Sequence, residues 1–152
     1  MSGIISSMKR GIDFPGVCVV FFCHDGKGNF ILGKRTKNTR DEHGRWDPGG
    51  GAVELGETIE EALRREIREE YATDVVDYEF LGFSDIHRQD EKDNRTHWIA
   101  FIFKALVSKD KVKNGVPDDH EEIRWFRLDN LPSPVHSQLQ NFLKKYRKKL
   151  IG

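Results

Sequence analysis

Four glutamates and one arginine in the first half of the chain have spacing that suits a metal-binding cluster. Glu57 precedes Arg65 and Glu66, and Glu69 and Glu70 follow closely. Each residue of an α-helix turns by about 100°, so residues three or four apart share a face and Glu66, Glu69 and Glu70 are predicted to lie together. Carboxylate oxygens suit Mg²⁺ or Mn²⁺ better than Zn²⁺. The pattern therefore indicates a candidate site for a divalent cation.

A helix must position these acids. Thr58 and Glu61 form a capping-box pattern, so the helix is predicted to begin at Thr58. Leu63 and Ile67, with Tyr71 further round, form an apolar stripe beside the acids, which predicts packing against a core. The alternative interpretation is a solvent-exposed charged helix whose arginines pair with its glutamates.

The segment before this helix favours a binding site over an exposed charged helix. Residues 47–57 are rich in glycine, which lets the backbone approach a ligand closely and adopt positive φ. A loop of this kind that leads into a helix N-terminus suits phosphate binding. The loop and the acidic helix together predict a site for phosphate and a metal ion.

Residues 51–73 also match a known family pattern. Gly51, Glu57, the triplet 65–67 and the pair 69–70 fall at the spacing G-x5-E-x7-R-E-U-x-E-E-x-G-U, where U is a bulky aliphatic residue. The chain therefore resembles the Nudix hydrolases, which are MutT-like nucleotide pyrophosphohydrolases. The last two positions depart from the pattern, because Thr73 replaces the aliphatic residue and Ala72 replaces the glycine. A left-handed conformation at Ala72 costs about 1 kcal/mol more than at glycine. The helix is expected either to end there or to continue to 73–74.

The resemblance implies a fold and a reaction. The fold is the Nudix fold, an α/β (α+β) arrangement with a mixed β-sheet between α-helices, and residues 1–152 are expected to form a single domain of this kind. The reaction is hydrolysis of a pyrophosphate bond in a nucleoside di- or triphosphate derivative. Bound Mg²⁺, or Mn²⁺ in its place, neutralises the charge of such a substrate and lowers the pKa of a bound water.

The resemblance also assigns roles to residues of the acidic cluster. It implies that Glu66 and Glu70 are the main metal ligands, with Glu69 and the Gly50 carbonyl as further ligands. Arg65 is expected to orient the glutamates rather than to touch the substrate.

The general base is the least determined role. Glu57 is expected to bind a second metal ion or to hold a metal-bound water. In the family the general base is either a glutamate of the motif or a later acid, and Glu121 and Glu122 are the candidates for the later acid here. Asp118 and Asp119 lie near enough to compete for this role, and the alternative for each of these four is an ordinary surface acid.

Substrate contacts are expected from the glycine-rich loop and from one basic residue. Gly50 and Gly51 are candidates through their backbone, and Arg35 through a phosphate contact, although Arg35 and Lys37 also suit an ordinary charged surface. Four aromatic residues are candidates for stacking on a base, and the alternative for each is a place in the core: Phe83, Trp98, Phe103 and Trp125.

The rest of the chain supplies the elements that hold this site. Runs of β-branched and aromatic residues predict strands at 17–23, 30–34, 78–84, 97–107 and 121–128. Residues 86–96 are expected to form a polar hairpin loop, and 1–15 a loose N-terminal arm. An amphipathic helix is predicted at 134–150.

Composition excludes some classes of protein. The 152 residues carry 25 basic and 25 acidic side chains, so the net charge is zero and nucleic acid is not an expected partner. No apolar run is long enough for a membrane span. Cys18 and Cys23 lie an odd number of residues apart and should face opposite sides of a strand, which favours reduced thiols in the cytoplasm. A small nucleotide is the expected partner, and a homodimer is compatible with the resemblance.

Two rival functions remain open at this point. One is a catalytically silent nucleotide sensor or partner-binding module on the same fold, because fold alone does not determine function. The other is hydrolysis of RNA caps or RNA ends, which the balanced charge does not favour. The identity of the nucleotide is left open.

Overall fold

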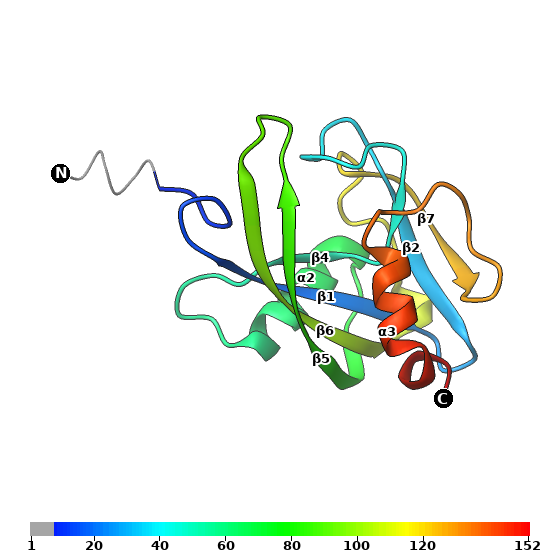
Figure 1. Ribbon diagram of the computed structural model, residues 1–152. Helices are drawn as coiled ribbons and strands as arrows, with labels where there is room; N and C mark the ends of the chain where they lie inside the picture. The colour runs from blue at the N-terminus through cyan, green and yellow to red at the C-terminus, as the bar shows by residue number, and fades with distance from the viewer. Residues whose placement is uncertain (1–7) are drawn as a thin grey trace.

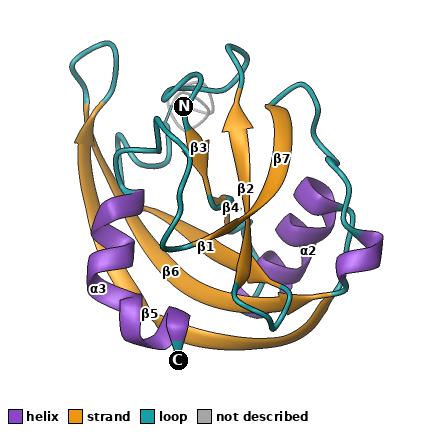
Figure 2. Ribbon diagram, turned by 90° about the vertical axis from the view of Figure 1, so that its right-hand side faces the viewer, coloured by secondary structure: helices purple, strands orange, loops and turns teal. Residues whose placement is uncertain are grey.

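The computed structural model describes residues 8–152, which form one mixed β-sheet with an α-helix packed on each face (Figures 1 and 2). This confirms the expected architecture. The strands are β1 (Gly16–His24), β2 (Asn29–Arg35), β3 (Trp46–Asp47), β4 (Gly50–Ala52), β5 (Val75–Gln89), β6 (Arg95–Val107) and β7 (His120–Arg127). The helices are α2 (Ile59–Tyr71) and α3 (Leu139–Ile151), with a short 3₁₀ turn, η1 (Lys109–Lys111).

The sheet is organised around β1. Its strand order is β3-β2-β1-β6-β5, with β4 paired to β1 and β7 paired to β2. β1 runs parallel to β6, from the pair Gly16–Trp98 to the pair His24–Leu106, and the other pairings are antiparallel. Strands with covered faces need apolar residues on both sides, and the continuous apolar run of β1 meets this need.

Two apolar cores lie on the two faces of the sheet. Val19, Phe21 and Cys23 pack with the α2 side, whereas Phe22 packs with the α3 side. Cys18 is packed against the α3-side core, so the two free cysteines face opposite ways as predicted. None of the helices in residues 8–152 is both long and apolar enough to cross a membrane.

Both ends of helix α2 are fixed by local hydrogen bonds and backbone conformation. The Glu61 amide donates to Thr58 Oγ1 at 3.1 Å, which confirms the predicted N-cap. Ala72 ends the helix with φ 52° and ψ 30°, so the alternative of a helix that continues to 73–74 is wrong. The following segment takes up the last carbonyls of the helix: the Lys113 and Gly115 amides donate to the carbonyls of Tyr71 and Glu70, each at 2.9 Å. These bonds require the chain to turn away at Ala72.

Replacing Ala72 with glycine is expected to stabilise the protein by up to about 1 kcal/mol, since the left-handed conformation at this position carries a steric cost that glycine lacks. The midpoint of urea unfolding at unchanged slope measures the difference. Ala62→Gly, at a buried helical position with ordinary geometry, is the control and is expected to destabilise. An Ala72→Gly variant less stable than the parent would show that the turn carries no strain.

The hairpin of β5 and β6 is longer than the sequence predicted. Residues 86–96 were expected to form a loop, but the ladder continues from Ile86–Trp98 to Gln89–Arg95 and leaves only 90–94 as the turn. The Asp90 carboxylate closes this turn by accepting from the Lys92 and Asn94 amides at 2.9 and 2.8 Å. A tight turn held by one carboxylate lets polar strands continue almost to their tip.

The C-terminal helix starts later than predicted. A helix was expected over 134–150, but α3 begins at Leu139 because the preceding backbone pairs with β3. The Trp46 amide donates to the Pro134 carbonyl at 3.0 Å, and the His136 amide donates to the Trp46 carbonyl at 2.8 Å. Trp46 itself is buried against Phe126 and is therefore a packing residue.

The expected loose arm at 1–15 falls partly outside the described residues. Residues 1–7 are not described by the structure, but the rest of this segment is held in place. The Gly11 amide donates to the Phe14 carbonyl at 2.7 Å, and the Gly11 carbonyl accepts from the His97 amide at 2.8 Å. The prediction of a loose arm is therefore wrong for residues 8–15, which form a turn against the start of β6.

Candidate active site

Helix α2 presents two of its glutamates to the short strand β4. Gly51 has no room for a side chain, because a Cβ there would lie 2.1 Å from Glu66 Cδ. The Gly50 amide donates to Glu70 Oε2 at 3.2 Å. Only 14% of the Glu66 side chain and 13% of the Glu70 side chain are exposed. The glycines therefore let two carboxylates sit, largely desolvated, directly against the backbone of the loop.

Arg65 ties the acids to the loop. Its Nε and Nη2 donate to the Glu57 carboxylate at 2.6 and 2.9 Å, and its Nη1 donates to Glu66 at 2.8 Å and to Glu69 at 3.3 Å. Nη2 also donates to the Ala52 carbonyl at 3.1 Å. The hydrogen bonds from Arg65 lower the pKa of Glu57 to about 2. Arg65 therefore contacts Glu57, Glu66 and Glu69 at once, and its expected role in orienting them stays a prediction.

Two residues that were not among the predicted site residues, Asp47 and His120, lie at the buried end of the candidate site. Asp47 accepts from Arg35 Nη1 at 2.9 Å, and its Oδ1 is buried with no hydrogen-bond partner among residues 8–152. His120 Nε2 lies 3.8 Å from Asp47 Oδ1 and 4.0 Å from Glu70 Oε1. The His120 ring stacks on Tyr71 and covers Gly33, where a Cβ would lie 2.9 Å from the ring.

Burial at this end of the candidate site disfavours the ionised form of its carboxyl groups. Burial raises the pKa of Glu70 well above its usual range, and the Asp47 carboxylate raises it further. Burial also raises the pKa of Glu66, with Arg65 opposing the shift, and that of Asp47, with Arg35 opposing it. Burial and the Arg35 charge lower the pKa of His120, so its imidazole is neutral near pH 7.

These carboxylates fit a hard divalent cation. Glu66 and Glu70 lie side by side on one helix face, Asp47 has an oxygen without a partner, and the charge of the group is only partly offset by Arg35 and Arg65. A divalent ion would supply the missing positive charge, and Mg²⁺ in proteins uses a few carboxylates and keeps several waters. Glu69 is 55% exposed and suits a position at the rim.

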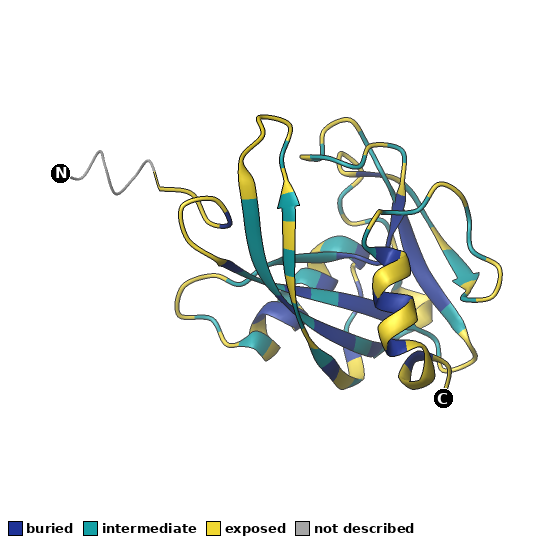
Figure 3. Ribbon diagram, viewed as in Figure 1, coloured by how far each residue is buried: buried dark blue, intermediate teal, exposed yellow. Residues whose placement is uncertain are grey.

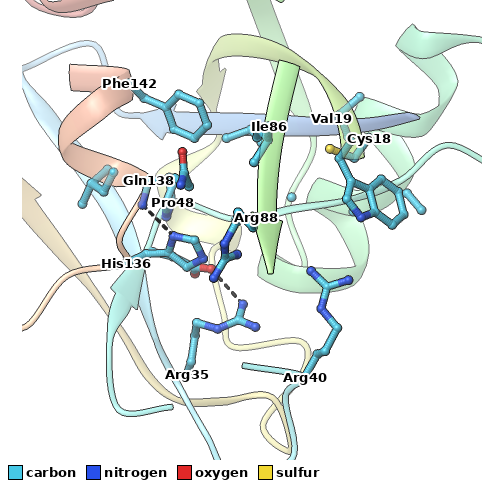
Figure 4. Close-up of a pocket in the computed structure, with 18 of the residues that line it drawn as sticks. Cys18, Val19, Arg35, Arg40, Pro48, Ile86, Arg88, His136, Gln138 and Phe142 are labelled. Carbon is cyan, nitrogen blue, oxygen red and sulfur yellow. Dashed lines mark hydrogen bonds and ion pairs between the residues drawn. The ribbon is translucent and has the colours of Figure 1, made fainter. Parts of the chain in front are cut away.

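A cavity of about 360 Å³ lies on the α3 side of β4. Gly50 and Gly51 line this cavity and also lie against Glu70 and Glu66, respectively. Its lining includes three arginines as well as the apolar side chains of Ile86, Trp98 and Phe142. Figure 4 shows Arg35, Arg40 and Arg88 on one side of the cavity and Phe142 and Ile86 on the other. An anionic and an apolar part of one ligand would both find complementary surroundings here.

The structure does not bring all predicted residues to this site. Glu121 pairs with Lys34 at 3.9 Å and Glu122 accepts from Arg124 at 2.8 Å, and neither lines the cavity. The pairing of β2 and β7 skips Glu121, because Lys34 lies opposite Glu122 and Arg35 opposite His120. This bulge places His120 beside Glu70. The one feature of the sequence that could have pointed to His120 is its position directly before Glu121 and Glu122.

The remaining predicted contacts divide between the cavity and the core. Arg35 lines the cavity, although its guanidinium is held by Asp41 and Asp47. Of the four aromatic candidates for base stacking, Trp98 lines the cavity, Phe103 is buried, Trp125 packs against the α2-side core and Phe83 is 58% exposed.

Comparison with known proteins shows which family this chain resembles. A family model for the NUDIX domain matches residues 14–146. The chain is 38% identical over 106 residues to an ADP-ribose pyrophosphatase of Methanocaldococcus jannaschii, an alignment that covers 70% of this chain and 59% of that protein. It is 32% identical over 124 residues to the nucleoside triphosphatase NudI of Escherichia coli, covering 78% of this chain and 84% of that protein.

The fold is shared with solved structures. The crystal structure of a MutT NUDIX hydrolase from Burkholderia pseudomallei superposes with a TM-score of 0.74 at 30% identity, covering 86% of this chain and 97% of that one. The chain spans about three fifths of the length of the ADP-ribose pyrophosphatase and most of the length of the other two proteins.

Proposed function

Because the chain belongs to the NUDIX hydrolase family, we propose that it is a Mg²⁺-dependent pyrophosphohydrolase of nucleoside triphosphates or of nucleoside diphosphates linked to another group. One observation carries the proposal: Glu66 and Glu70 meet the glycine strand on one side, and an arginine-edged cavity opens on the other. The two relatives named above act, by their names, on ADP-ribose and on nucleoside triphosphates, which are substrates of this class.

The chain's own residues account for binding and orientation. Glu66 and Glu70 would hold the metal ion, with Glu69 at the rim and Asp47 as a further carboxylate. When bound, the ion neutralises diphosphate charge and makes a bound water more acidic. Arg65 keeps Glu57 and Glu66 in place, which spares the site the cost of ordering them during the reaction.

The size and lining of the cavity indicate which part of the substrate it would hold. Its volume of about 360 Å³ is near the lower end for ligand pockets, which suits one nucleoside. Within the described part of the chain Arg40 has one long ion pair, 3.8 Å from Asp41, and is the arginine of the cavity most available to a phosphate. Trp98 and Phe142 offer apolar surface to a base or a ribose.

The test is product identification from a panel of nucleotides that includes ADP-ribose and the common nucleoside triphosphates. We expect a nucleoside monophosphate, with pyrophosphate or a phosphorylated second product, in Mg²⁺ and at least a hundredfold less in EDTA. Calorimetric binding without any turnover would support the nucleotide-sensor alternative instead. Equal rates with and without Mg²⁺ would overturn the proposal.

A further inference from the structure

A second group of metal-binding side chains lies on the β5–β6 hairpin, apart from the acidic site. Asp85 and His87 are two residues apart on β5, and His97 lies directly opposite His87 on β6. Alternate residues of a strand share a face, and residues directly opposite in an antiparallel pair have Cβ atoms about 5 Å apart. Potential ligand atoms of the three side chains all lie within 4.8 Å of one another.

This group faces away from the cavity. Ile86 and Arg88 alternate with Asp85 and His87 along β5, and both line the cavity on the α3 side of the sheet. Trp98, the neighbour of His97, also lines the cavity. The hairpin therefore separates the two sites, with the nucleotide cavity on one face and the Asp–His–His group on the other.

The exposed face of the hairpin leaves room for an ion and its waters. Asp85 and His87 are exposed and His97 is half-buried. Figure 3 shows the exposed tip of the hairpin, which extends beyond the neighbouring strands. The two imidazole rings stack with centroids 4.2 Å apart, and His97 Nε2 lies 2.8 Å from Asp85 Oδ1. These contacts hold the three side chains together before any ion binds.

We propose that Asp85, His87 and His97 form a site for a transition-metal ion of the Zn²⁺ class, with water in the open position. Two imidazoles and one carboxylate are ligands that suit Zn²⁺, whereas the all-carboxylate site on α2 suits Mg²⁺. Ligand atoms on one tetrahedral Zn²⁺ lie roughly 3.3 Å apart, given bonds of about 2 Å. Exposed side chains reach this spacing from the present arrangement by small changes of rotamer. The ion replaces the hydrogen bond between His97 and Asp85, and any proton held there goes to solvent.

Binding at this site has a structural consequence. The ion would join β5 to β6 just before the turn 90–94. Anything that binds only the folded state stabilises it by mass action. The same two strands carry Arg88 and Trp98 on the cavity face, so the ion also stiffens one wall of the nucleotide cavity. The inference does not depend on the proposed enzymatic function.

The test is calorimetric titration of the full chain with Zn²⁺ in excess Mg²⁺, which occupies the carboxylate site. We expect one equivalent of Zn²⁺ in the parent chain and in Glu66→Gln. The variants His87→Ala and His97→Ala are expected to bind at least tenfold more weakly. His43→Ala removes another exposed histidine, whose ring contacts only the Thr39 carbonyl among the described residues, and should leave binding unchanged.

A second measurement separates a bound ion from loss of structure. Amide hydrogen exchange of residues 90–94 should slow on addition of Zn²⁺ in the parent chain and in His43→Ala, but not in His87→Ala. Thermal unfolding without Zn²⁺ should be similar in the parent, His43→Ala and His87→Ala, because these two substituted side chains are exposed. Zn²⁺ binding of equal strength in His87→Ala and the parent, or none in the parent, would overturn the proposal.

Discussion

Glu70→Gln is expected to lower turnover at least about a hundredfold while the fold remains intact. Glu70 is largely buried, close to Asp47 and Glu66, and it is placed by the Gly50 amide. Glutamine keeps the shape and the hydrogen bond but removes the charge that would hold the cation. A hundredfold loss corresponds to about 2.7 kcal/mol of transition-state stabilisation, a usual amount for one preorganised charged group.

The measurement is nucleoside monophosphate release in Mg²⁺, with Glu60→Gln as the matched control. Glu60 lies on the same helix, half-exposed, and among residues 8–152 its ion pair is with Arg64, so its loss should leave turnover within about twofold. Without divalent ions, Glu70→Gln should melt at a higher temperature than the parent, because a buried carboxylate that resists ionisation has been neutralised. Near-normal turnover in Glu70→Gln would contradict the assignment of Glu70 as a metal ligand.

Arg65→Ala is expected to reduce turnover by about tenfold to a hundredfold and to lower stability as well. The change frees Glu57, Glu66 and Glu69 at once and leaves the Ala52 carbonyl without its donor. Without the Arg65 guanidinium between them, these carboxylates repel one another and no longer lie in the geometry that the metal ion requires. Arg68→Ala is the control, since Arg68 is 72% exposed on the same helix and pairs with Asp74 outside the site.

The pH dependence of stability distinguishes this role from simple packing. Hydrogen bonds from Arg65 lower the pKa of Glu57 to about 2 in the folded protein, below its unfolded value of about 4.3. A depressed carboxyl pKa contributes stability above the unfolded pKa, and that contribution is lost as pH falls through the folded pKa. The Tm difference between the parent and Arg65→Ala, measured in EDTA, should therefore be largest near pH 7 and shrink from about pH 4 to pH 2. A difference independent of pH would indicate lost packing alone.

Local features of the site were readable without the structure. The cap at Thr58, the shared face of Glu66 and Glu70 and the apolar stripe of Leu63 and Ile67 were all confirmed. Each depends on residues three or four apart on one helix, whose relative positions follow from helix geometry alone. The strong apolar runs that became β1 and β6 were also recognisable from the sequence, because their residue types are typical of buried strands.

Long-range features needed the tertiary structure. His120 lies fifty residues from Glu70 in the sequence, and a bulge opposite Arg35 brings it there in place of Glu121. Asp47 lies near these acids because the chain from β3 to β4 contacts α2: the Tyr71 hydroxyl donates to the Pro48 carbonyl at 2.9 Å, and the Gly50 amide donates to Glu70 at 3.2 Å.

The sequence by itself therefore determined which helix carries the acids and what chemistry they suit. Only the tertiary structure decided which groups surround Glu70, how far the β5–β6 hairpin extends, and that Asp85, His87 and His97 meet on the face opposite the cavity. The physical reason is that strand register and bulges depend on pairing partners distant in the chain, whereas a helix sets the spacing of its own side chains.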